Sequence, residues 1–209
     1  MKKDEVIVYI KDKIVRNVYK DGQRIVEANL CRQLNVGRSI VREALRHLEQ
    51  EGYLEIIPNK GAVVKELTQK DIAQMYDLMA VLEGLSMRVA TAKISNDDIK
   101  KIENIIDRME KVKDDNKLLF QENLEFHQFL TQLGGNTHLI AIMNGIREKA
   151  YRMGLQSFYS LGQAEASQDD HREILEAVKK RNPELVEELI RKHYTTSRDR
   201  LIKNIHKTL

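Results

Sequence analysis

The stretch that decides the fold is EANLCRQLNVGRSIVREALRHL, residues 27–48. Two short amphipathic segments lie on either side of a break at residues 35–37, which is the arrangement of a helix-turn-helix. In the second segment the apolar residues recur at helical spacing and predict one buried face. These residues are Val41, Ala44, Leu45 and Leu48.

A second face of the same predicted helix is basic. Arg38, Arg42 and Arg46 recur every four residues, so their side chains lie on one side of the helix. A helix with one buried face and one arginine face suits the major groove of DNA, where arginine binds guanine edges or phosphates. The alternative is an ordinary solvated basic face. The turn and the segments that follow favour DNA binding.

The segments around this motif complete a winged helix. Residues 4–19 predict a first helix with an apolar stripe that runs from Val6 to Val18. After the motif, residues 53–57 and 62–65 read as two strands joined by a turn, and they form a β-hairpin. Lys60 and Gly61 lie at the tip of this hairpin, and Lys60 is interpretable as a plain surface lysine.

Residues 34–45 resemble the signature of the GntR family of bacterial transcription regulators, LGVSRTPVREAL. The shared positions are Leu34, Val36, Arg38, Val41, Arg42, Glu43, Ala44 and Leu45. The departures are Asn35, Gly37, Ser39 and Ile40. Gly37 is still a permitted N-cap, and Ser39 keeps a hydroxyl for a phosphate. The resemblance implies a DNA-binding fold in which Lys60 and Gly61 at the tip of the hairpin approach the minor groove or the DNA backbone. It leaves the operator sequence open.

Composition and charge agree with two soluble domains. The 209 residues carry a net charge of +3, and all of that excess lies in the first part: 13 basic and 10 acidic residues up to Glu66, then 22 of each. We expect a winged-helix domain at 1–66, a linker at 67–70 and a second domain at 71–209. Cys31 is the single cysteine, and no apolar run approaches membrane-spanning length, so we expect a cytoplasmic protein without a membrane partner.

The second domain reads as an antiparallel all-α bundle, which makes the chain mainly α. The expected helices cover 71–89, 96–109, 118–133, 139–154, 169–180 and 183–205. Ser95 with Asp98 predicts a capping box at the start of the second of these helices. This half resembles the FCD effector domain of the FadR branch of the GntR family. The landmarks are Phe126-His127, Gly135-Asn136 and the segment from His171 to His193.

Histidines in this half predict a metal site. Asn123 and His127 lie four apart on one helix, and a tight connection at residues 181–183 would bring His171 close to His193. Imidazoles that converge inside a bundle suit zinc, nickel or another divalent ion. The family resemblance assigns His127, His171 and His193 as ligands, with Asn123 at the position of an aspartate. The alternative is a set of buried histidines without a metal.

The asparagine bears on the effector. An amide supplies no charge, so we expect a divalent ion here to lack compensating protein charge and to favour an anionic ligand, such as a small carboxylate. In the family that this half resembles, many members have an arginine four residues before the glutamate that corresponds to Glu83, where this chain has Met79. Arg147, Tyr151 and Arg152 are the candidates for replacing it, and the arginines are equally interpretable as surface residues.

These features predict a ligand-responsive regulator, most simply a repressor that binds a palindromic operator as a homodimer. One alternative is a metal-sensing regulator in which the ion itself is the signal. A weaker alternative is a metal-dependent hydrolase, since three histidines with an open position can activate water. Against it, Glu122, Asp169 and Asp170 are merely near the histidines in sequence, and none is marked as a general base.

Overall fold

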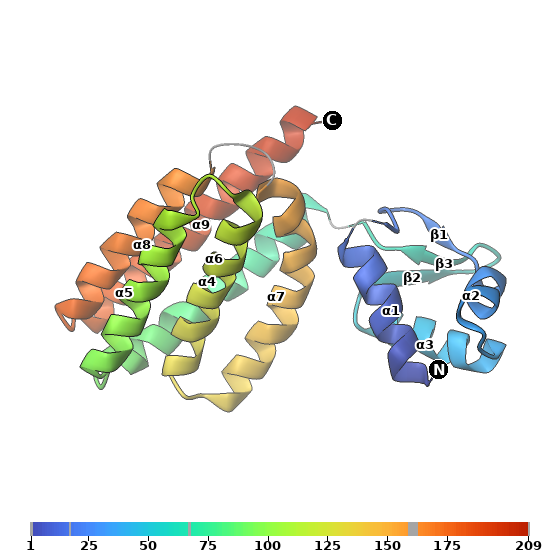
Figure 1. Cartoon of the computed structure of the whole chain (residues 1–209), viewed down its shortest axis with the longest axis horizontal. Coiled ribbons are helices and arrows are strands. Elements are labelled where there is room, and N and C mark those ends of the chain that lie inside the picture. Colours follow the sequence, from blue (N-terminus) through green and yellow to red (C-terminus); the bar gives the residue numbers. More distant parts are fainter. Residues whose placement is uncertain (1, 17, 67, 159–162, 209) are drawn as a thin grey trace. The chain divides into compact units, whose positions relative to one another are not determined.

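A computed structural model describes the backbone of residues 2–16, 18–66, 68–158 and 163–208. It describes the side chains of these residues except 116, 149–158, 163–166 and 204–208. The chain divides into two compact units, Met1–Thr68 and Gln69–Leu209. Each is described by itself below (Figure 1).

The first unit is a winged helix. Its elements are α1 (Lys3–Val15), β1 (Arg24–Ile25), α2 (Glu27–Leu34), α3 (Arg38–Gln50), β2 (Leu54–Ile57) and β3 (Gly61–Val64). The predicted apolar face of α3 is confirmed, because Val41, Ala44, Leu45 and Leu48 are all buried. They pack with residues of α1, α2 and the strands into one hydrophobic core. The α3 helix therefore turns its arginine face away from that core.

The turn between α2 and α3 depends on Asn35. This residue has φ of 52°, in the left-handed region. Asparagine tolerates that conformation better than most residues with a side chain, so it can replace the glycine of the family signature. Gly37 is the N-cap of α3, as predicted, and no side chain caps the helix there. The local chemistry of residues 35–37 thus ends one helix and begins the next.

Two details of this unit were not predicted correctly. The predicted hairpin is present as β2 and β3, but the sequence did not predict β1, which adds a third antiparallel strand in the order β1-β3-β2. The α1 helix ends at Val15, and Val18 is exposed rather than part of the apolar stripe. The reason is a helix-terminating motif in which the backbone N–H of Val18 donates to the carbonyl of Lys13, which closes the last turn.

The second unit is a bundle of helices. These are α4 (Gln69–Thr91), α5 (Asn96–Lys111), α6 (Asn116–Leu133), α7 (Thr137–Phe158), α8 (Gln163–Lys179) and α9 (Pro183–Thr208). The predicted helices are all present, with α4 and α8 starting earlier than expected and α9 ending later. The predicted capping box at Ser95 is confirmed, since its hydroxyl accepts from the backbone N–H of Asp98.

The α4 helix lies at the centre of this bundle and runs beside α9 (Figure 1). Small residues allow its neighbours to approach closely. A side chain at Gly134, at the end of α6, would clash with the hydroxyl of Ser86 on α4. Ser86 in turn donates its hydroxyl to the carbonyl of Thr131 at 2.8 Å. This close contact of α4 with α6 fixes the helices that carry the buried polar site described below.

Candidate functional site

The basic face of α3 is open to solvent. Arg38, Ser39, Arg42 and Arg46 are all exposed on it. Within the described part of the chain, Arg42 is the one of the three arginines with an ion pair, since its Nε lies 2.9 Å from Oε2 of Glu27. Exposed arginines on a helix whose other face is buried are free to meet phosphates or base edges.

The tip of the wing lies between β2 and β3. Asn59 and Gly61 both have positive φ, 62° and 84°, which turns the chain sharply. Lys60 between them is exposed. The turn therefore presents a lysine and a glycine backbone at the end of a two-stranded projection. This is the placement that the sequence predicted for Lys60 and Gly61.

In the helical unit, three histidines meet in the interior. His127 lies on α6, His171 on α8 and His193 on α9, and their exposed fractions are 7%, 1% and 3%. One ring nitrogen from each lies within 4.8 Å of those from the others. The predicted convergence is confirmed. It depends on the tight connection at residues 181–183, where Arg181 has positive φ and α9 folds back against α8.

Two of these imidazoles are oriented by carboxylates. Nδ1 of His127 lies 2.7 Å from Oε1 of Glu83, and Nδ1 of His193 lies 3.2 Å from Oδ2 of Asp170. Burial raises the pKa of Glu83, but His127 and Arg147 together bring it below its ordinary value. The hydrogen bond from His193 lowers the pKa of Asp170. Both carboxylates are therefore ionised and accept the Nδ1–H of each ring, as in metal sites where a carboxylate orients a histidine ligand.

The remaining ring nitrogens point at one another. Nε2 of His127 and Nε2 of His193 are 3.3 Å apart. In the neutral tautomer that donates Nδ1–H to a carboxylate, a ring has only a lone pair at Nε2, so with both rings in this form two lone pairs face each other. A tetrahedral ion with metal–nitrogen bonds of about 2.0–2.1 Å holds two nitrogens about 3.3–3.4 Å apart. The geometry of this pair therefore fits a shared cation.

His171 completes the donor set. It is buried, and neither of its ring nitrogens has a hydrogen-bond partner in the described part of the chain. Burial lowers its pKa well below the ordinary value, and the neighbouring imidazoles add to that effect. Burial also lowers the pKa of His193, against the opposing influence of Asp170. Neutral imidazoles are the form that binds metals, so the chemistry of the site fits a divalent ion.

A wider hydrogen-bonded network surrounds Glu83, which is fully buried on α4. Its Oε2 accepts from Nη2 of Arg147 on α7 at 2.5 Å, from the hydroxyl of Tyr194 on α9 at 2.9 Å and from Thr131 on α6 at 3.2 Å. Arg147 also donates to the carbonyl of His127 at 2.7 Å. The carboxylate of Glu83 thus links α4, α6, α7 and α9 in one hydrogen-bonded network that includes His127.

These contacts correct one expectation. The asparagine at position 123 led us to expect no compensating protein charge for an ion, yet Glu83 and Asp170 each contact a histidine of the cluster. Arg147 offsets part of that charge through its ion pair with Glu83. The negative charge near the candidate ligand nitrogens therefore comes from Glu83 and Asp170, which contact the histidines, and not from a residue that would bind the ion directly.

The other predicted site residues are placed as follows. Asn123 is half-buried on α6, one turn before His127. Met79 is buried in the hydrophobic core of the unit. Arg147 is buried beside the cluster, and its Nη1 has no partner in the described part of the chain. The side chains of Tyr151 and Arg152 lie outside the described residues. Effector binding by Arg147, Tyr151 and Arg152 stays a prediction.

Sequence reasoning missed the partners of the histidines. Glu83 carried a signal, because it lies four residues from both Met79 and Met87 on the buried face of α4. A carboxylate in the middle of an apolar stripe needs a partner inside the protein. Asp170 carried no such signal, since it is one of several acidic residues around His171.

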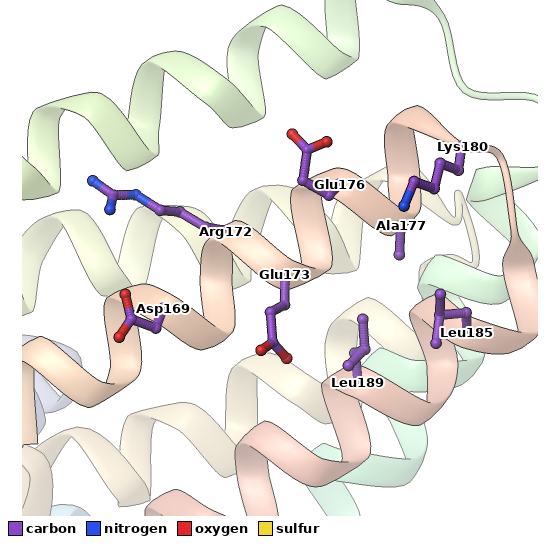
Figure 2. A pocket seen from close by; sticks show the side chains of 8 residues that line it. All are labelled: Asp169, Arg172, Glu173, Glu176, Ala177, Lys180, Leu185 and Leu189. Atoms are coloured by element: carbon purple, nitrogen blue, oxygen red, sulfur yellow. The ribbon is translucent and has the colours of Figure 1, made fainter.

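The outer surface of α8 and α9 carries a separate groove of about 640 Å³ (Figure 2). Its floor includes Leu185 and Leu189 of α9, and no histidine of the cluster lines it. Three of the charged residues that line it form ion pairs: Arg172 with Glu110, Glu173 with Lys192, and Glu176 with Lys179. The groove is therefore distinct from the histidine cluster, and no functional role is assigned to it.

Comparison with known protein families identifies the family of this chain. The model of bacterial regulatory proteins of the gntR family matches residues 2–64, and the FCD domain model matches residues 74–196. The chain belongs to the GntR family, in the FadR branch with an FCD domain. It is a DNA-binding transcription regulator and not an enzyme. No helix of the described part is long and apolar enough to cross a membrane.

Similar proteins include transcription regulators, and a solved structure shares the fold. The chain is 27% identical to the uncharacterized HTH-type transcriptional regulator YdhC of Bacillus subtilis, over 88% of this chain and 84% of that protein. It is 27% identical to the gluconate operon transcriptional repressor of Bacillus licheniformis, over 94% of this chain and 77% of that one. The structure of E. coli McbR/YncC shares its fold, with a TM-score of 0.75 and 16% identity over 97% and 98% of the two chains.

Proposed function

We propose that this regulator is a homodimeric repressor of a palindromic operator, and that a small carboxylate acting at a divalent metal in the FCD domain controls it. The observation that carries the proposal is the pair of facing Nε2 atoms of His127 and His193, 3.3 Å apart, each ring fixed by a carboxylate. Repression is supported by similarity to a named repressor, the gluconate operon repressor.

For DNA binding, the proposal uses the exposed face of α3. Arg38, Arg42 and Arg46 bind base edges or phosphates in the major groove, and Ser39 donates its hydroxyl to a phosphate. The wing supports them through Lys60 and the backbone at Gly61. Two such heads, about one helical turn of DNA apart, would match the two half-sites of a palindrome.

For dimerisation, the proposal uses an exposed apolar face on α4. Its residues recur every three or four positions and are 43–53% exposed; they are Leu78, Val81, Leu85 and Val89. Ile142 on the neighbouring helix α7 is also exposed, at 54%. An apolar stripe of this length at helical spacing is suited to pack against the same stripe of a second copy.

For ligand binding, the proposal assigns the metal to His127, His171 and His193, with Asn123 as a weaker fourth donor. Zinc and nickel suit a set of buried imidazoles. A bound ion would supply a positive centre for a carboxylate. Nη1 of Arg147, which has no partner among the described residues, would donate a hydrogen bond to the same carboxylate. Such a ligand must favour one arrangement of the two heads over another in order to alter operator affinity.

The test uses the untagged full-length chain and a duplex that it selects from a random-sequence pool. Operator affinity is measured by fluorescence anisotropy in a chelator, with zinc or nickel, and with each metal plus a panel of small carboxylates. The proposal predicts that a carboxylate weakens binding only when the metal is present. A response to metal alone would instead make the protein a metal sensor, and selection of no sequence would overturn operator binding.

A further inference from the structure

One contact on the recognition helix has a role that the function proposed above does not include. Arg42 lies on α3, and Glu27 is the first residue of α2. Nε of Arg42 donates to Oε2 of Glu27 at 2.9 Å, and the two side chains are 60% and 38% exposed. A carboxylate from the first helix of the motif thus holds an arginine of the second.

The guanidinium nitrogen of Arg42 that contacts Glu27 determines which nitrogens remain to recognise a DNA base. Guanine offers two acceptors, O6 and N7, to a guanidinium that presents two parallel N–H groups. The contact with Glu27 uses Nε, and no other contact to Arg42 is present in the described part of the chain. Nη1 and Nη2 of Arg42 are therefore both available to form a bidentate contact with a base. Because the guanidinium is planar, fixing Nε also fixes the direction in which the other two nitrogens point.

The other arginines on this face are arranged differently. Arg38 and Arg46 are exposed, and neither has an ion pair in the described part of the chain. A negative charge at a surface that meets phosphates weakens binding to any DNA sequence. Glu27 lies beside one arginine and opposes general phosphate attraction there. Such an arrangement favours sequence reading over charge neutralisation.

We infer that Glu27 is a positioning residue that orients Arg42 for a base contact and so raises the specificity of operator binding. The inference rests on the operator binding proposed above. Arg42 is thereby assigned to a base contact, whereas Arg38 and Arg46 can contact either bases or phosphates. The plain alternative is an exposed ion pair without any role in DNA recognition, which is the common case for such pairs.

Three interpretations of Glu27 differ in how its removal changes the affinities for two kinds of DNA. If Glu27 orients Arg42, its loss weakens binding to the selected duplex and strengthens binding to a scrambled one. If Glu27 only repels phosphates, both duplexes bind more tightly by the same factor. If the pair is incidental, the ratio of the two affinities stays the same as well.

The experiment compares the full-length parent, Glu27→Gln and Glu27→Asp. Affinities for the selected duplex and for a scrambled duplex of the same base composition are measured by fluorescence anisotropy at one salt concentration. Glu27→Asp keeps the charge but shortens the side chain, so a loss of specificity in this variant reports positioning alone. Glu43→Gln, which removes an exposed charge from α3, is the charge-matched control.

We expect both Glu27 variants to lower the ratio of specific to scrambled affinity by about fivefold to tenfold, part of the discrimination that a bidentate arginine–guanine contact supplies. Glu43→Gln should leave the ratio within about twofold of the parent. In an Arg42→Ala background the Glu27 variants should have no further effect on the ratio, because the residue they act through is gone.

An unchanged ratio in both Glu27 variants would overturn the inference, and so would an equal loss in the Arg42→Ala background. Circular dichroism and the thermal midpoint of each variant establish that it is folded. If the parent itself selects no duplex from the random pool, the proposed operator binding fails, and this result is distinct from a failure of the Glu27 variants.

Discussion

The two domains of this regulator hold their candidate functional side chains in opposite ways. On α3, the arginines stand exposed, and of the three only Arg42 has an ion pair in the described part of the chain. In the helical bundle, His127, His171, His193, Glu83 and Arg147 are all buried. Among the described residues, Glu83 hydrogen-bonds to His127 and Arg147, and Asp170 hydrogen-bonds to His193. A candidate site can therefore lie on an exposed helix face outside the core, as on α3, or form part of the buried core, as in the bundle.

This contrast has an energetic consequence. An exposed arginine contributes little to stability, because water solvates it almost as well as a surface partner does. A buried charge depends on its partners, since removing one leaves the other uncompensated in the interior. Substitutions of the exposed arginines on α3 should therefore change DNA binding and leave stability nearly unchanged. Substitutions in the buried network should change stability and ligand binding together.

The largest expected effect is that of Glu83→Ala. It leaves Arg147, His127 and Tyr194 without their shared acceptor, so we expect the free energy of unfolding of the metal-free protein to fall by about 3–5 kcal/mol. Urea denaturation followed by circular dichroism, in a chelator, measures it. The control is Glu103→Ala, which removes an exposed ion pair with Lys179. If both variants lose the same free energy of unfolding, the buried carboxylate is no more important for stability than the exposed one, and the contrast between the two kinds of site is wrong.

The next effect is that of Arg42→Ala on the other domain. Operator affinity should weaken by about 1–3 kcal/mol if Arg42 contacts a base. The free energy of unfolding should change by no more than about 0.5 kcal/mol, as at other surface positions. Anisotropy titrations at several salt concentrations measure the affinity and its salt dependence. A large loss of stability in this variant would break the comparison between the two domains.

A smaller effect tests the metal ligands. Asn123→Asp restores a charged oxygen one turn before His127, and we expect metal affinity to rise by about tenfold, within the range that changes around metal ligands produce. Competition with a chromophoric chelator measures the affinity of the parent and the variant. If the two affinities are the same, Asn123 does not take part in the site.

The smallest effect is that of Lys60→Ala at the wing. If Lys60 binds one phosphate, the slope of log affinity against log salt should become shallower by about 1, with the loss nearly the same for selected and scrambled duplexes. The same anisotropy assay reports both quantities. A loss confined to the selected duplex would instead mean that the wing reads sequence.

The sequence predicted the local features of this molecule better than the distant ones. Helix periodicity, the capping box at Ser95 and the glycine cap at Gly37 depend on neighbours along the chain, and all three appear in the structure. The β1 strand was missed because it is two residues long and pairs with β3, far along the chain. No periodic pattern marks a strand of that length.

The candidate site shows the same limit. The convergence of the three histidines followed from their spacing, from the connection at residues 181–183 and from the family resemblance. The role of Glu83 did not, because its partners come from α6, α7 and α9 and are separated from it by up to 111 residues. Such partners share no local pattern. A lone carboxylate on an apolar helix face indicates that partners exist without identifying them.

The most direct test of the account is the metal content of protein purified without a histidine tag, measured by inductively coupled plasma mass spectrometry for the parent and for His127→Ala. The account predicts about one divalent ion per parent chain and its loss in the variant, with the variant still folded by circular dichroism. If neither protein holds a metal, even after incubation with zinc or nickel followed by desalting, the histidine cluster is not a metal site and the central claim is wrong.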